Sequence, residues 1–135
     1  MSIELHTDNL IIKKPSEVHL NFLIKELNNW NISQWLVNVP YPYTIDDAKY
    51  WLKKTKADDY CFNIFIKNIL IGGISITNKK NNTNPELGYW IGEDYWGKGY
   101  ANEACTNLIK YFFLNTSHNI IYASHMKGNI KSKKI

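Results

Sequence analysis

Hydrophobic residues recur at helical spacing in three stretches, and each stretch predicts one helix. Leucine and isoleucine at 20, 23, 24 and 27 predict a first helix, which Ser16 would cap after Pro15. A capping box at Thr44-Ile45-Asp46-Asp47 predicts a second helix to about Lys54. The third should run from about Tyr100 to Leu114. The expected buried faces of the last two are Ile45, Ala48, Trp51 and Leu52, and Ala101, Ala104, Cys105, Leu108, Ile109 and Phe112.

Five apolar runs without helical spacing are typical of strands, and they lie at 9–13, 60–66, 69–77, 86–92 and 119–125. Only Lys67-Asn68 separates the second run from the third, so these two should form an antiparallel hairpin. The last helix joins two strands, and such a crossover implies parallel pairing. The expected order is β-α-α-β-β-β-α-β, which predicts an α/β fold with a mixed sheet.

Composition narrows the class of protein. The chain has 135 residues, 44% of them apolar, and we expect a single domain over 1–135. Two cysteines and four scattered histidines indicate neither a disulfide framework nor a metal site. No apolar run is long enough to span a membrane, and residues 1–30 lack the layout of a signal peptide, so a soluble cytoplasmic protein is expected. All 16 cations are lysine in a net charge of +4, which argues against nucleic-acid recognition and suits a small anionic ligand.

The segment 86–104 reads as a strand, a glycine-containing turn and the start of a helix. The first amides of a helix have no partner within the helix, and the helix dipole adds positive charge there. Gly97 and Gly99 would let a ligand approach the backbone, and Lys98 adds a full charge. These features predict a cradle for phosphate or pyrophosphate. Taken alone, G-x-G before a helix is more often an ordinary turn that binds nothing. Asn102 excludes a dinucleotide fingerprint, and the P-loop pattern is absent.

The same segment, ELGYWIGEDYWGKGYANEA, resembles motif A of the GNAT superfamily of acyl-CoA-dependent N-acetyltransferases, and within it the Rim type that acetylates ribosomal-protein N-termini. Asn102 is the main departure inside the motif. Three further segments resemble other parts of that branch: HTDNLIIKKP, VPYPYTIDDAKYWL and ASHMKGNIKSKKI. The resemblance covers nearly the whole chain. It departs at the end, where the family continues with more helix and two more strands, so we expect a C-terminally short GNAT domain.

The resemblance implies a sheet splayed between strand 86–92 and strand 119–125, with acetyl-CoA in the opening. It implies transfer of the acetyl group to a primary amine, a protein N-terminus or a small molecule, by direct attack on the thioester. An amide near Ile91 would polarise the carbonyl. Glu86 would be the general base and Ser132 the acid for the thiolate. The implied coenzyme A contacts are Trp90, Ile91, Gly92, Trp96, Gly97, Lys98, Gly99, Tyr100, Ala101 and Asn129. No metal is implied.

Plainer roles exist for several of these residues. Glu86 can be a solvated carboxylate at a strand end, Asn129 a turn residue and Ser132 a solvated serine. Trp35, Tyr41 and Tyr43 either line the acceptor pocket or pack within their loop, and Cys105 reads as a small packed hydrophobe. A non-catalytic acyl-CoA-binding module is the alternative function, because part of the family fold is expected to be missing. The strand edge left there would be covered by the 127–135 tail or by a second copy in a homodimer.

Overall fold

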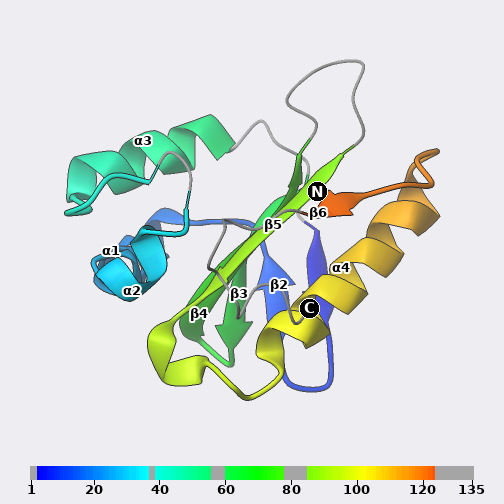
Figure 1. Cartoon of the computed structure of the whole chain (residues 1–135), viewed down its shortest axis with the longest axis horizontal. Coiled ribbons are helices and arrows are strands. Elements are labelled where there is room, and N and C mark those ends of the chain that lie inside the picture. Colours follow the sequence, from blue (N-terminus) through cyan, green and yellow to red (C-terminus); the bar gives the residue numbers. More distant parts are fainter. Residues whose placement is uncertain (1–2, 37–38, 56–59, 78–84, 124–135) are drawn as a thin grey trace.

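The computed structural model describes residues 3–36, 39–55, 60–77 and 85–123. A six-stranded sheet forms the centre, and its strands lie in sequence order (Figure 1). The strands are β1 (Glu4–His6), β2 (Ile11–Lys13), β3 (Cys61–Ile66), β4 (Ile69–Thr77), β5 (Glu86–Ile91) and β6 (Tyr122–Ala123). Every neighbouring pair is antiparallel except β5 and β6, which are parallel. The mixed α/β fold expected from the sequence is confirmed.

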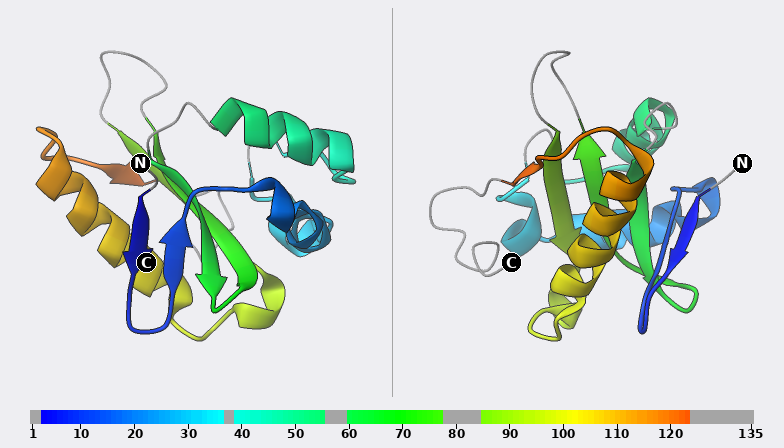
Figure 2. Two further views of the ribbon diagram at one scale, coloured as in Figure 1. Left: turned by 180° about the vertical axis from the view of Figure 1, so that it is seen from behind. Right: turned by 90° about the vertical axis from the view of Figure 1, so that its right-hand side faces the viewer.

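Helices cover both sides of the sheet (Figures 1 and 2). On one side lie α1 (Leu20–Leu27), α2 (Trp30–Ser33) and α3 (Ile45–Thr55), and on the other lies α4 (Tyr100–Asn115). The capping box forms as predicted at the start of α3: the Thr44 hydroxyl accepts from the Asp47 N–H at 3.2 Å, and the Asp47 carboxylate accepts from the Thr44 N–H at 2.9 Å. These bonds fix where the chain turns from loop into helix.

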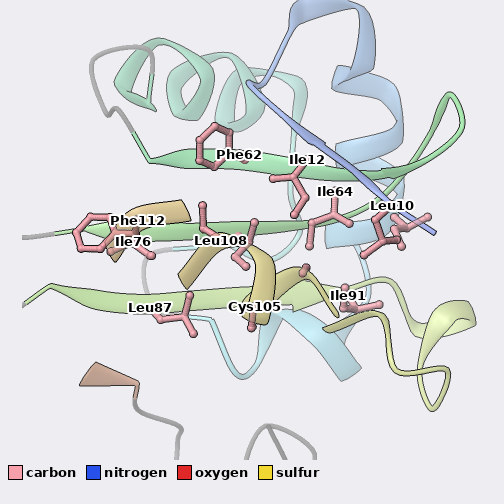
Figure 3. Packing of buried hydrophobic residues seen from close by; sticks show 13 residues of the cluster. Leu10, Ile12, Phe62, Ile64, Ile76, Leu87, Ile91, Cys105, Leu108 and Phe112 are labelled. Atoms are coloured by element: carbon pink, nitrogen blue, oxygen red, sulfur yellow. The ribbon is translucent and has the colours of Figure 1, made fainter. Parts of the chain in front are cut away.

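The core on the α4 side is made by alternate residues of the strands and one face of the helix (Figure 3). Leu87 and Ile91 of β5 point to this side, where they pack with Cys105 and Leu108 of α4. A second buried cluster joins α1, α2 and α3 around Leu23, and Trp90 of β5 packs against it. Strand β5 therefore has one face toward α4 and the other toward α1–α3, because successive side chains alternate.

The hairpin over Lys67-Asn68 is present, with Lys67 in the left-handed region at φ 55°. Strand β6 pairs with β5 through two residues, Glu86 with Tyr122 and Leu87 with Ala123. The Tyr122 N–H also donates to the Pro85 carbonyl at 2.8 Å. The parallel crossover predicted from the order of the elements is thus confirmed. Residues 124–135 lie outside the described part of the chain, so the splayed opening stays a prediction.

Several local expectations were wrong. The strand expected over 9–13 is present but shorter, as β2, and the strand before it, β1, was not predicted because it has only one apolar residue to mark it. Ser16 makes no side-chain cap, and a single 3-10 turn at Glu17–His19 precedes α1. The last strand was expected to begin at residue 119 but begins at Tyr122, and the end expected at 125 lies outside the described residues. Helix α2 was not predicted, because four residues are too few to show a period.

The face of α3 was also only partly right. Ala48 and Leu52 are buried as expected, and Trp51 is half-buried against the α1–α3 core. Ile45 is 43% exposed, so it does not belong to the core. It is the first residue of the helix, where the chain still runs along the surface. On α4, Ala104, Cys105, Leu108 and Phe112 are buried, while Ala101 and Ile109 pack at the margin of the core.

The close packing of β4 against β5 predicts that a single methyl group added at Gly72 will destabilise the fold. A Cβ at Gly72 would overlap the backbone carbonyl oxygen of Trp90 on β5 and touch the Ile91 side chain. Backbone within a sheet cannot move aside cheaply, so Gly72→Ala should lower the free energy of unfolding by about 1–3 kcal/mol. Gly88→Ala is the matched control, since its nearest neighbour would be the Ser75 hydroxyl at 3.7 Å. Urea unfolding measures both; equal stability of the two variants would contradict the prediction.

Candidate functional site

The turn between β5 and α4 provides a place where a ligand can reach the backbone. Gly97 and Gly99 have φ of 76° and 82°, in the left-handed region that favours glycine. A Cβ built on either glycine would meet no atom within 4 Å. The space beside both residues is therefore open, as the predicted cradle requires. Lys98 lies between them and is exposed.

Helix α4 begins directly after this open space. Gly99 is the N-cap of α4 and supplies no side chain to bond these amides. The first bond within the helix runs from the Glu103 N–H to the Gly99 carbonyl at 3.0 Å. The N–H groups of Tyr100 and Ala101 precede it and have no partner within the helix. With the dipole of a 16-residue helix behind them, they favour an anion at this point.

Trp96 connects this turn to the end of β5. Its indole Nε1 donates to the Ile91 carbonyl at 2.7 Å, and its half-buried ring packs against the cores on both sides of the sheet. Gly92 directly follows Ile91, and its N–H donates to the Ile71 carbonyl on β4 at 2.7 Å. Backbone groups alternate in direction along a strand, so the Ile91 N–H points away from β4, toward the β6 side. This is the direction required of an amide that polarises a ligand in the opening.

Glu86, Gly88, Trp90 and Gly92 share the face of β5 that looks toward α1–α3. Glu86 is exposed and begins the strand, with Thr77 and Tyr122 as its register partners. The Trp90 indole lies over Gly73, where a Cβ would overlap it. Gly73 thus makes room for the tryptophan, and Gly92 makes room for another side chain in the same way.

That side chain is Glu26 of α1, whose carboxylate occupies the position that a Cβ of Gly92 would take. Burial raises the pKa of Glu26; the charge of Lys25 opposes this effect and that of Asp94 adds to it. A carboxyl group held against the end of β5 was not predicted. A lone glutamate near the end of an amphipathic helix carries no sequence signal that would separate it from a solvated one.

Two asparagines tie α2 to the same turn. The carboxylate of Glu93 accepts from Asn29 Nδ2 at 2.7 Å and from Asn31 Nδ2 at 3.2 and 3.1 Å. Asn28 contacts the loop before α3 instead. Its Oδ1 accepts from the Tyr43 N–H at 2.6 Å, and its Nδ2 donates to the Tyr43 carbonyl at 2.5 Å. Residues 28–31 therefore connect the loop before α3 with the turn before α4. These polar contacts were also not predicted.

The N-terminus of α4 is held from a third direction. The Glu103 carboxylate accepts from the Asn9 N–H at 2.8 Å, from Asn9 Nδ2 at 2.9 Å and from the Thr7 hydroxyl. Burial alone would raise the pKa of Glu103, but the bonds from Asn9 and Thr7 outweigh it, so the pKa lies below the ordinary 4.5. The one acidic side chain in the first turn of α4 is thus bound to the β1–β2 connection.

This lowered pKa predicts how Glu103 contributes to stability at different pH. A carboxyl whose pKa is lower in the folded protein stabilises the fold above its unfolded pKa of 4.5, and that contribution disappears as the pH falls below it. Glu103→Gln should therefore lower the melting temperature at pH 7, and the difference from wild type should shrink as the pH falls through the lowered pKa of Glu103. Glu17→Gln is the control, on an exposed residue of the 3-10 turn. A Glu103→Gln difference that persists unchanged at low pH would contradict this account.

The remaining residues considered from the sequence are buried, partly buried or exposed, or lie outside the described chain. Cys105 is buried, and burial raises the pKa of its thiol to about 12, so it packs as expected and is not nucleophilic. Tyr43 is buried, and burial with the nearby Asp47 raises its pKa to about 12, which favours loop packing. Trp35 is half-buried, and Tyr41 is exposed beside the Trp30 ring. Two candidates, Asn129 and Ser132, lie outside the described residues.

The described residues hold neither a membrane-spanning helix nor a metal-binding cluster. No helix among them is both long and apolar enough to cross a bilayer. No group of three or more histidine, cysteine or acidic side chains in the same part of the chain is arranged to hold a metal ion.

Known proteins resemble this chain in sequence and in fold. A family model described as "Acetyltransferase (GNAT) domain" matches residues 9–135. The "Uncharacterized N-acetyltransferase p20" of Bacillus licheniformis is 36% identical over 78 residues, 55% of this chain and 43% of the relative. The match thus spans less than half the length of that relative.

Solved structures share the fold at lower identity. A GNAT-family acetyltransferase from Bacillus anthracis superposes with a TM-score of 0.85 at 21% identity, covering 98% of this chain and 79% of that one. RimL, a ribosomal L7/L12 alpha-N-protein acetyltransferase solved in complex with coenzyme A, gives 0.83 at 17% identity, with 98% and 80% covered. These likenesses show the fold, and the family model covers most of the chain. The chain therefore belongs to the GNAT acetyltransferase family.

Proposed function

We propose that this protein transfers the acetyl group of acetyl-CoA to a primary amine. The observation that carries the proposal is the open, left-handed pair Gly97 and Gly99 at the uncapped start of α4. A cradle of backbone amides with room for close approach fits the pyrophosphate of coenzyme A. Membership of the GNAT family supplies the reaction class.

The proposed coenzyme A contacts are those that the resemblance implies, and the open turn before α4 supports the part that would hold the phosphates. The amides of residues 97–101 and the Lys98 ammonium would bind the phosphates. The pantetheine arm would run beside Trp90–Gly92, where the Ile91 N–H points to the β6 side, and Asn129 would also contact it. Acetyl-CoA supplies an activated thioester. The amine nitrogen attacks its carbonyl carbon, the C–N bond forms, the C–S bond breaks, and coenzyme A leaves as a thiol.

The proton balance assigns roles to two further residues. The attacking nitrogen must lose a proton, and Glu86 is the candidate base because it opens β5 on the face toward α1–α3. Ser132 is the candidate acid for the departing thiolate. A free thiol ionises near about pH 8.5, so the acid assists but is not essential.

A peptide N-terminus is the first acceptor to test, because RimL, a structural relative, is an alpha-N-protein acetyltransferase. The exposed Tyr41 and Trp30 lie on the α1–α3 side, beside the segment that reaches the β5–α4 turn. A small-molecule amine is the other acceptor class, and a panel containing both distinguishes them.

The test has a binding arm and a turnover arm. Desulfo-CoA at about 100 times its Kd should stabilise the fold by about 2.7 kcal/mol, a shift of several degrees in melting temperature. Acetyl-CoA with an amine panel should release free thiol. Binding without release for any amine would indicate an acyl-CoA-binding module instead. A melting temperature that millimolar coenzyme A leaves unchanged would contradict the cradle itself.

A further inference from the structure

The Asn31–Glu93 contact joins two parts of the proposed site that come from distant segments. Asn31 lies in α2, on the side of the molecule where the acceptor would approach, and Glu93 lies in the turn that leads to Gly97. The Asn31 amide donates to both oxygens of the carboxylate, and Asn29 donates to one of them. A charged acceptor makes these bonds stronger than bonds between neutral groups.

The surrounding contacts show that this junction is braced. Asn29 also caps α2, because its Oδ1 accepts from the Asn31 N–H at 3.0 Å. The Glu26 carboxylate of α1 lies against Gly92, one residue before Glu93. Through Asn28, the same segment holds the backbone of Tyr43. A shift of residues 28–31 would therefore be felt in the α3 loop and in the β5–α4 turn together.

We propose that Asn29 and Asn31 are positioning residues that act through Glu93. They hold the α1–α2 layer in a fixed relation to the turn that carries Gly97 and Gly99. This rests on the proposed function, in which the turn holds the acetyl donor and the α1–α3 side holds the amine. Two reactants held by different segments react only when those segments are aligned, and a displacement of about 1 Å can cost about 100-fold in rate.

Exchanging the donor and the acceptor of the Asn31–Glu93 contact distinguishes a positioning role from a general contribution to stability. Asn31→Asp keeps the size of the side chain but turns its donor into an acceptor facing a carboxylate. Adding Glu93→Gln restores a complementary pair, because the glutamine amide can donate to the new carboxylate while its oxygen still accepts from Asn29. Asn21→Asp is the matched control: it adds the same charge on the exposed face of α1, and the Asn21 side chain makes no hydrogen bond within the described part of the chain.

The activity arm compares these variants with coenzyme A affinity. N31D should lower kcat/KM for the amine about 10- to 100-fold, while the Kd for desulfo-CoA changes by less than about twofold. N31D/E93Q should recover most of the loss, and N21D should match wild type within about twofold. Wild-type kcat/KM in N31D, or a double variant no better than N31D, would overturn the proposal.

Hydrogen exchange decides the same question without turnover. Amides of residues 30–34 and 92–99 should exchange faster in N31D than in wild type, and N31D/E93Q should reverse this in both segments. Equal exchange in N31D and wild type would overturn the positioning role. If wild type releases no thiol with any amine, the proposed function fails, and the exchange result still confirms or overturns the junction by itself.

Discussion

Replacing Glu86 by glutamine should lower kcat about 10²–10⁴-fold, the usual contribution of a general base. Glutamine keeps the shape of the side chain at the start of β5 but cannot take a proton from the attacking amine. The affinity for acetyl-CoA should stay near wild type, because the phosphates are expected beyond the far end of β5, in the turn and helix start at residues 97–101. Turnover of the amine at saturating acetyl-CoA measures the effect most directly, and kcat should be lower in the variant at every pH from about 6 to 9.

Glu86→Asp is the companion variant, since it keeps the carboxylate and should retain more activity than the glutamine. Desulfo-CoA binding measured for all three proteins controls for damage to the cradle. Equal turnover of wild type and Glu86→Gln across about pH 6–9 would return Glu86 to the role of a solvated carboxylate at a strand end.

The parts of the fold that the sequence predicted are those governed by local rules. The capping box at Thr44 and Asp47 formed because both partners lie within one turn of each other. The buried face of α4 followed from the spacing of its apolar residues, and the hairpin at Lys67-Asn68 from a two-residue gap between apolar runs. Strand β1 was not predicted because three residues show no periodicity. What makes it a strand is its antiparallel pairing with β2, which lies outside its own sequence.

In the candidate site too, the features set by neighbouring residues were predicted and the contacts between distant residues were not. The cradle at Gly97 and Gly99 was predicted, because the glycines and the helix start are adjacent in sequence, and the structure gives both glycines the left-handed backbone. The contacts that hold the cradle in place were not. Glu93 and Asn31 are 62 residues apart, and Glu103 and Asn9 are 94 apart. A carboxylate bonded by a remote amide looks, in one sequence, like any surface carboxylate.

Gly99 is the residue at which the cradle can be tested most sharply. A branched side chain such as valine would be strained at φ 82°, so a loss of binding in Gly99→Val would mix strain with obstruction. Asparagine tolerates the left-handed region because its amide bonds to nearby backbone. Gly99→Asn should therefore keep most of the stability while it fills the open space beside the first amides of α4.

We expect Gly99→Asn to weaken desulfo-CoA binding by at least about tenfold, equivalent to about 1.4 kcal/mol. Isothermal titration measures the affinity, and thermal unfolding without ligand measures the residual strain separately. Gly88→Ala serves as the control on the same strand–turn–helix segment, since its added methyl group makes only ordinary contact with Ser75. A Gly99→Asn protein that melts like wild type and binds desulfo-CoA with wild-type affinity would show that the phosphates are held elsewhere. The open space beside Gly97 and Gly99 would then be a feature of the turn alone.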